Sequence, residues 1–149
     1  MYRDNYTAKK KVAVFTNGEG NVGIELDGEN ALKSGKGHAG LEKLNSGSLT
    51  IADKDKDKNG KLAAEGSEYG AGIGGGCYGA GNNITVSGDA KLLKVQGGVE
   101  DNIDGAGAGI GNGGSNADGS RIPGAEVEPD ISGLTTGRIE YYAPGADME

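Results

Sequence analysis

The sequence predicts an all-β protein, a parallel β-solenoid of about three rungs with three short strands in each rung and an irregular cap at either end. Three observations support this prediction. Glycine makes up 31 of the 149 residues, roughly three times its usual share of about 7%. The motif GAGIGGG at residues 70–76 returns as GAGIGNG at residues 107–113. Short apolar runs around both copies alternate with polar residues, which is typical of strands buried on one face.

The segments between the glycine motifs repeat as well, and they divide residues 22–113 into rungs. SLTI (48–51) corresponds to NITV (83–86), and GKLAAEG (60–66) corresponds to AKLLKVQGG (90–98). Repeated units of this kind stack coil upon coil at about 4.8 Å. The predicted strands are residues 22–26, 30–34 and 39–44, then 48–52, 61–65 and 70–74, and finally 83–87, 91–95 and 107–111.

Each predicted strand carries one or two large apolar residues that we expect to point into the coil. Glycine, Asn and Asp occupy the corners between strands, where positive φ is needed. The strand with the pattern A-G-[LI]-G has almost no side chains, so it either packs closely against its neighbours or offers a flat face to a ligand. The predicted inward stack is Ile24, Leu26, Leu32, Leu41, Leu49, Ile51, Leu62, Ile73, Ile84, Val86, Leu92 and Ile110.

We expect residues 1–149 to form a single domain whose ends close the stack. Residues 1–21 form an N-terminal cap or partial rung in this interpretation, with KKKVAVFT (9–16) as its strand. From residue 114 the repeat decays, and residues 114–149 form a loop followed by a C-terminal cap whose last strand lies in TGRIEYYAPG (136–145). Caps are expected because an open solenoid end is an unpaired strand edge.

Charge and hydropathy limit the partners. The net charge is −7, and residues 96–149 hold 10 of the 22 acidic residues but only 2 of the 15 basic ones. Nucleic acid is therefore not an expected partner, because phosphate binding needs a basic face. No apolar stretch approaches the ~20 residues of a membrane helix, and the N-terminus lacks a signal-peptide core. The single cysteine, Cys77, excludes an internal disulfide.

Residues 22–113 contain the motif YGAGIGGG, which is preceded by LTI and GKLAAEG and followed by NITVSG. These motifs and their order resemble the glycine-rich repeats of bacterial cell-surface proteins. Among named groups, they are most similar to the β-solenoid carbohydrate-binding domain family of clostridial surface proteins. The resemblance implies a right-handed parallel β-helix, an extracellular location, polysaccharide binding and calcium among the ligands of some members. We accordingly expect a mature form or a fragment of an exported protein.

One acidic stretch has the beginning of a calcium loop. In ADKDKDKNGKLAAEG (52–66), side chains with oxygen ligands occupy every second position before Gly60, as in the first half of an EF-hand loop. The flanks are predicted strands rather than helices, so the metal hypothesis is a calcium site of low affinity at a solenoid corner and not an EF-hand. The alternative is a solvated corner, since interleaved lysines lower its negative field. The candidate ligands are Asp55, Asp57, Asn59 and Glu65.

A second acidic group lies in the insertion before the last GAGIG. Glu100, Asp101 and Asp104, together with Asp118, form either a cation-binding edge or a solvated loop.

Tyrosines mark the candidate glycan contacts. Tyr69 and Tyr78 flank GAGIGGG at its two corners, and Tyr141 and Tyr142 lie in the final segment. An aromatic ring can stack on a sugar, so Tyr69 and Tyr78 are the predicted glycan-binding pair. The alternative is that they shield the edges of the solenoid.

Catalysis is not expected. His38 and Cys77 are each the only residue of their type and could meet on one face, but no third group that would orient them is evident. Gly70, Gly72 and Gly75 fit a dinucleotide-binding spacing, yet no helix follows them. The predicted function is a non-catalytic cell-surface module that binds polysaccharide or mediates adhesion. The alternative is a structural spacer or a filament subunit that associates head to tail.

Overall fold

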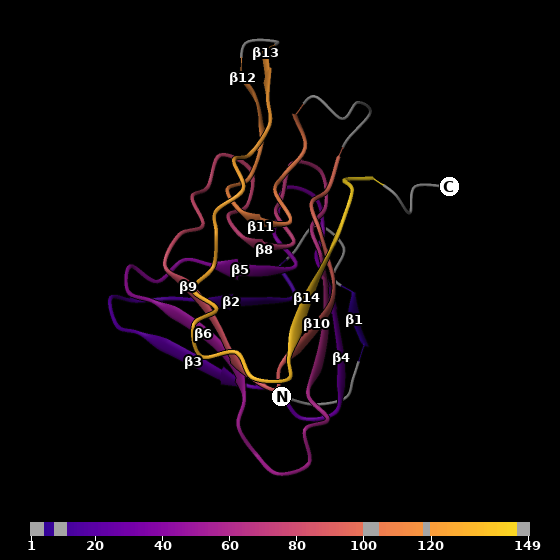
Figure 1. Cartoon of the computed structure of the whole chain (residues 1–149). Coiled ribbons are helices and arrows are strands. Elements are labelled where there is room, and N and C mark those ends of the chain that lie inside the picture. Colours follow the sequence, from indigo (N-terminus) through magenta and orange to yellow (C-terminus); the bar gives the residue numbers. More distant parts are fainter. Residues whose placement is uncertain (1–4, 8–11, 100–104, 118–119, 146–149) are drawn as a thin grey trace.

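The structure is a computed structural model that describes residues 5–7, 12–99, 105–117 and 120–145. These residues contain no α-helix, and apart from one antiparallel hairpin their strands form three parallel sheets that enclose a common interior (Figure 1). Within the described part of the chain, no helix is long and apolar enough to cross a membrane. The prediction of an all-β, solenoid-like arrangement of short parallel strands is confirmed.

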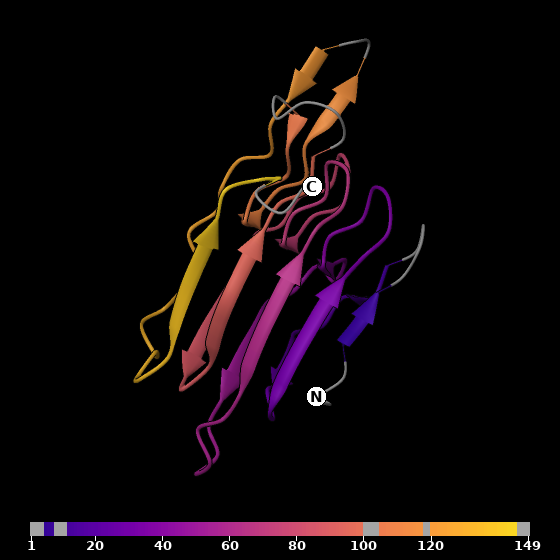
Figure 2. The same ribbon diagram turned by 90° about the vertical axis from the view of Figure 1, so that its right-hand side faces the viewer.

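The three sheets are named A, B and C. Sheet A contains, in spatial order, β1 (Asn5–Thr7), β4 (Glu29–Lys33), β7 (Lys61–Glu65), β10 (Lys91–Gln96) and β14 (Arg138–Tyr142). Sheet B contains β2 (Val14–Thr16), β5 (Leu41–Lys43), β8 (Ile73–Gly74) and β11 (Ile110–Gly111). Sheet C contains β3 (Val22–Glu25), β6 (Leu49–Asp53) and β9 (Ile84–Gly88). Figure 2 shows the strands of sheet A side by side and pointing the same way.

The chain passes through sheets C, A and B in that order and does so three times, so each circuit adds one strand to every sheet. Strand β7 has the predicted bounds, and every other predicted strand of these circuits coincides with an observed one to within three residues at either end. The agreement follows from the period-2 pattern, because each strand buries one face against the shared interior.

Equivalent apolar residues stack on one another through the register of the parallel pairs. Leu41 lies opposite Ile73, which lies opposite Ile110, and Leu62 lies opposite Leu92. Eleven of the twelve predicted inward residues are buried, and Ile24 is partly buried against the same cluster. The cluster also contains three residues outside the predicted stack, namely Ala64, Ala90 and Val95.

The glycine motif is explained by close packing of successive rungs. A Cβ atom at Gly107 would lie 2.1 Å from the carbonyl oxygen of Gly70, and a Cβ atom at Gly70 would lie 2.0 Å from that of His38. Residues 70–76 and 105–111 are buried. Of the two alternatives for the A-G-[LI]-G strand, the structure therefore shows close backbone packing and no exposed flat face.

The two ends of the stack continue the circuits. Strand β2 within the predicted 9–16 segment pairs with β5, and β14 within 136–145 pairs with β10. Residues 114–135 are not only loop, because β12 (Ser115–Ala117) and β13 (Ser120–Ile122) form an antiparallel hairpin. Its short strands, SNA and SRI, lack the apolar alternation that marks the others, which is why the sequence predicted a loop there.

Candidate functional site

The two tyrosines that flank GAGIGGG occupy equivalent β-turns. The amide of Gly70 donates to the carbonyl of Ser67 at 2.7 Å, and the amide of Gly79 donates to the carbonyl of Gly76 at 2.7 Å. Tyr69 and Tyr78 are the third residues of these turns, with φ of 73° and 65°. Glycine or asparagine normally fills this position, because positive φ brings a side chain close to the backbone.

The two rings have different surroundings. Tyr69 is 7% exposed, and its ring covers Gly105, where a Cβ atom would lie 2.9 Å from Cε1 of the tyrosine. Tyr78 is 66% exposed. The ring of Tyr69 is thus packed inside the molecule, and only Tyr78 of the predicted pair exposes its ring to solvent.

Tyr78 borders a groove of about 440 Å³ between its own turn, the corner after β11 and the segment after β13. Ile122, which lies on the far side, is 56% exposed. The side-chain oxygen of Asn112 accepts the amide hydrogen of Gly81 at 2.9 Å, which ties the corner after β11 to the segment before β9. Among the described residues, no charged side chain lines the groove, whose lining is Tyr78, Gly79, Ala80, Asn112, Gly113, Ser115, Ile122, Pro123, Gly124 and Ala125.

The far wall of this groove has no signal in the sequence. Ile122, Pro123 and Ala125 belong to the hairpin and its continuation, which the sequence presents as a run of turn residues. No local signal connects this run to Tyr78, because the two segments meet only through the stacking of the third circuit.

Tyr141 and Tyr142 lie on another part of the surface, at the end of β14. They are 50% and 42% exposed, and Nζ of Lys94 lies 5.1 Å from the centre of the Tyr142 ring. Partial burial and the negative charges of Glu126 and Glu128 raise the pKa of Tyr141.

A second groove, of about 330 Å³, opens beside the ends of β4, β7 and β10. Its lining includes the charged residues Lys33, Glu65 and Glu68, and Glu65 pairs with Nζ of Lys94 at 3.5 Å.

The predicted calcium ligands do not come together. Asp55 and Asp57 are neighbours in the corner between β6 and β7, where the amide of Asp57 donates to Oδ1 of Asp55 at 3.1 Å. The side-chain oxygen of Asn59 accepts the amide hydrogen of Gly28 at 3.4 Å instead. Glu65 is the last residue of β7. It lies about 13 Å from the start of this strand, at ~3.3 Å per residue, and therefore away from the corner that holds Asp55 and Asp57.

A different acidic cluster does form at this corner. One carboxylate oxygen from each of Glu25, Asp53 and Asp55 lies within 4.8 Å of those of the other two. Partial loss of hydration, together with the negative charges of Asp53, Asp57 and Glu25, raises the pKa of Asp55. Glu25 was not predicted as part of this site, because this residue belongs to the preceding circuit and is adjacent only through the pairing of β3 with β6.

Two other sequence predictions concern residues elsewhere. Glu100, Asp101, Asp104 and Asp118 lie outside the residues that the structure describes. His38 and Cys77 lie at adjoining corners, where the amide of Cys77 donates to the carbonyl of Gly37 at 2.8 Å.

A carboxylate that the sequence did not suggest orients the imidazole of His38. Nδ1 of His38 lies 3.0 Å from Oε1 of Glu42, and the same oxygen accepts the amide hydrogen of Ala39 at 3.0 Å. The Glu42 carboxylate therefore fixes the corner that precedes β5.

Comparison with protein-family models finds no matching family, and comparisons with curated proteins and with solved structures find no significant match.

Proposed function

We propose that this chain is a non-catalytic module of a bacterial cell surface that binds neutral polysaccharide in the groove beside Tyr78. The observation that carries the proposal is the combination of a left-handed backbone and an exposed ring at Tyr78. The groove beside it has the size of a small-ligand site.

The backbone of Tyr78 needs a compensating interaction. A left-handed conformation costs an L-residue about 1–2 kcal/mol, and strained residues of this kind concentrate at binding sites. Burial of the Tyr69 ring offsets the strain energy of its backbone, whereas Tyr78 leaves most of its side chain in solvent. In the preceding circuit, the turn that corresponds to that of Tyr69 carries Gly37 at φ 81°, so a turn of this type does not require a tyrosine. The ring at position 78 is better explained by contact with a ligand.

The chemistry of the groove favours a neutral sugar. One face of a pyranose ring is apolar and packs on an aromatic ring, while its hydroxyl groups exchange hydrogen bonds with amides and hydroxyls. Tyr78 and Ile122 supply apolar surface, and Asn112 and Ser115 supply polar groups. Since the described lining of the groove carries no charge, a charged polymer would gain little there.

The cell-surface location and the right-handed coil are part of this proposal. The similarity of residues 22–113 to glycine-rich repeats of bacterial surface proteins supports the location. The hand of the coil is supported by a general rule, since crossover connections between parallel strands of one sheet are right-handed in about 98% of cases. A rigid stack of short strands would hold the groove in a fixed shape, which reduces the ordering cost of binding.

A glycan array tests the proposal with the wild-type chain, Tyr78→Gly and the matched control Tyr142→Ala, which removes an exposed ring from sheet A. The wild type should retain one class of neutral polysaccharide. Tyr78→Gly should lose at least about tenfold in affinity, equal to about 1.4 kcal/mol, and Tyr142→Ala should bind normally. Retention of no glycan by the wild type, or equal binding by Tyr78→Gly, would refute the proposal.

The alternative function is a structural spacer or filament subunit, and one observation favours it. Phe15 on β2, the end strand of sheet B, is 51% exposed, and an apolar edge strand invites pairing with another chain. At the other end of the same sheet, however, Glu126 covers β11. Head-to-tail stacking would need both ends open. Light scattering over a range of concentrations distinguishes the two, because a filament subunit grows in mass and a monomeric module does not.

A further inference from the structure

The corner between β6 and β7 gathers three carboxylates from two circuits. Glu25 ends β3, Asp53 ends β6 and Asp55 follows two residues later. Their nearest oxygens lie within 4.8 Å of one another. Two oxygens bound to the same calcium ion at 2.3–2.6 Å can be at most about 5 Å apart. One ion can therefore contact all three carboxylates without rearrangement of the backbone.

The carboxylate of Asp53 distinguishes this corner from an ordinary solvated loop. Asp53 is 0% exposed, and its Oδ2 accepts the amide hydrogen of Gly60 at 2.7 Å. Its other oxygen, Oδ1, is buried and has no hydrogen-bond partner among the described residues. A buried carboxylate oxygen without a partner is costly, and buried charges are normally paired with an ion or a donor. A bound cation would supply the missing partner.

Backbone amides hold each carboxylate of the cluster in place. Oε2 of Glu25 accepts the amide hydrogen of Lys54 at 2.7 Å, and Oδ1 of Asp55 accepts that of Asp57 at 3.1 Å. Together with the bond from Gly60 to Asp53, these contacts fix all three ligands before an ion arrives. Such supporting hydrogen bonds orient metal ligands in proteins.

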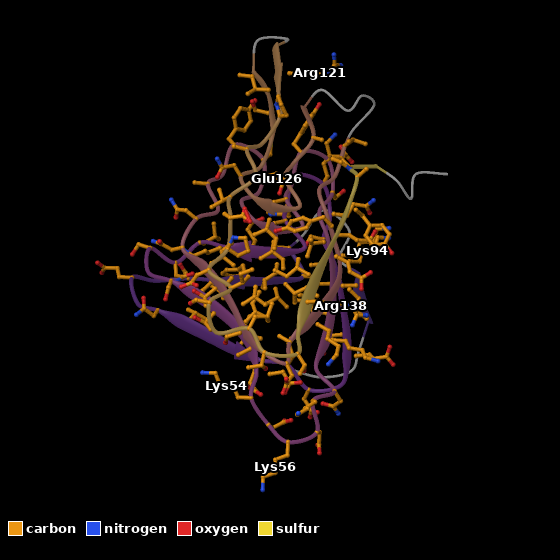
Figure 3. The ribbon with its side chains drawn as sticks, in the orientation of Figure 1. Lys54, Lys56, Lys94, Arg121, Glu126 and Arg138 are labelled. Carbon is orange, nitrogen blue, oxygen red and sulfur yellow. The ribbon has the colours of Figure 1, made fainter. Side chains whose placement is uncertain are left out.

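The interleaved lysines do not occupy the cluster. Lys54 and Lys56 are exposed, and their side chains extend outward from the corner (Figure 3). The alternation of Asp and Lys thus separates the two kinds of charge. Dissolved salt screens the exposed ammonium groups over about 10 Å at ~0.1 M ionic strength, while the carboxylates face one another.

We propose that Glu25, Asp53 and Asp55 form a calcium site that ties the ends of β3 and β6 to the corner before β7. The all-oxygen ligand set suits a hard divalent cation. Calcium accepts the irregular geometry of an exposed corner, whereas magnesium demands a near-ideal octahedron at about 2.1 Å. The site is separate from the groove at Tyr78 and does not depend on glycan binding.

Calorimetric titration of the full chain with calcium chloride tests the site. Glu25→Gln and Asp53→Asn should each raise the dissociation constant at least about tenfold. Asp57→Asn and Glu65→Gln are matched controls that also remove one negative charge, and each should change it less than about threefold. The melting temperature of the wild type should rise with calcium concentration, because an ion that binds only the folded state stabilises it.

The following outcomes would overturn the site. The first is the absence of binding heat in the wild type at about 5 mM calcium, a concentration above the dissociation constants typical of extracellular calcium modules. The second is tighter binding of magnesium than of calcium. The third is an equal effect of Glu25→Gln and Asp57→Asn on the dissociation constant. Glu25 is exposed, so Glu25→Gln decides the matter even if Asp53→Asn fails to fold. Tyr78→Gly should bind calcium as the wild type does, so failure of one proposal leaves the other standing.

Discussion

Tyr69 and Tyr78 share one hydrogen-bonding partner and one backbone conformation but differ in the burial of their rings. The amide of Gly114 donates to the carbonyl of Tyr69 at 2.7 Å, and the carbonyl of Gly114 accepts the amide hydrogen of Tyr78 at 3.0 Å. Both residues have positive φ, so both turns carry similar strain. Only Tyr69 offsets this strain by packing, with 7% of the residue exposed against 66% for Tyr78.

The same substitution should therefore have opposite effects at the two tyrosines. Tyr78→Gly relieves strain and removes little packing, so we expect the free energy of unfolding to rise by about 0.5–1 kcal/mol after the added chain entropy of glycine is subtracted. Tyr69→Gly leaves a cavity, so we expect a loss of about 3 kcal/mol. Urea denaturation measures both. Loss of stability in Tyr78→Gly similar to that in Tyr69→Gly would show that the exposed ring stabilises the fold.

The strands could be predicted because their signal is local. Each has a period-2 apolar pattern between glycine-rich corners, as in KLAAE of β7, whose predicted and observed bounds agree. Burial in such a strand follows from the pattern alone, since alternate side chains point to opposite faces.

The candidate sites could be predicted only in part, because they depend on which residues lie opposite one another in successive circuits. Glu25 lies opposite Ala52, one residue from Asp53, although 28 positions separate Glu25 from Asp53 in the sequence. The order of residues along the chain instead favours Glu65, which lies at the other end of β7 from this corner. Similarly, Tyr69 is buried by Gly105 of the next circuit, and no local feature of the sequence indicates this contact.

Substitution of a stacked glycine should destabilise the solenoid far more than substitution of an exposed one. A Cβ atom at Gly107 would lie 2.1 Å from the carbonyl oxygen of Gly70, whereas a Cβ atom at Gly23 would have no neighbour within 4 Å. We expect Gly107→Ala to lower the free energy of unfolding by about 3 kcal/mol or more. Gly23→Ala should be neutral or raise it by up to about 1 kcal/mol. Urea denaturation of the two variants checks this, and equal effects would contradict the stacking of the two motifs.

Asp89 should make the cap strand β14 sensitive to acid. Its Oδ1 accepts hydrogen bonds from the hydroxyl groups of Thr136 and Thr135, which lower the pKa of Asp89 below its ordinary value of 3.8. A lowered pKa stabilises the fold at pH values above the ordinary one, and this contribution disappears as the pH falls through the pKa of the folded state. The wild type should thus lose stability below about pH 4.

Asp89→Asn and Thr136→Val test this origin of the acid sensitivity. Both variants should be less stable than the wild type at about pH 7. The difference should shrink as the pH falls below the ordinary Asp pKa of 3.8 and through the lowered pKa of folded Asp89. Urea denaturation at a series of pH values measures the difference. A constant difference across the series would show that the carboxylate charge of Asp89 does not contribute.

Glu126 should keep the molecule from pairing with other chains at the end of sheet B. Its Oε2 accepts the amide hydrogen of Gly109 at 2.8 Å and its Oε1 accepts that of Ile110 at 3.3 Å, and its backbone bridges to Gly111 in antiparallel fashion. Figure 3 shows Glu126 in the segment that follows the hairpin. Amide groups released at a sheet edge are a template for a strand of another molecule.

We therefore expect Glu126→Ala to associate as its concentration rises, while the wild type and the neighbouring control Glu128→Ala keep a constant mass. Size-exclusion chromatography with light scattering measures the mass at each concentration. Association is expected because the variant leaves the amides of Gly109 and Ile110 without their carboxylate acceptor. The carbonyl groups of a strand from another molecule can then accept these hydrogen bonds. If Glu126→Ala keeps the same mass as Glu128→Ala at every concentration, the carboxylate is not what blocks this edge, and the backbone bridge to Gly111 is sufficient.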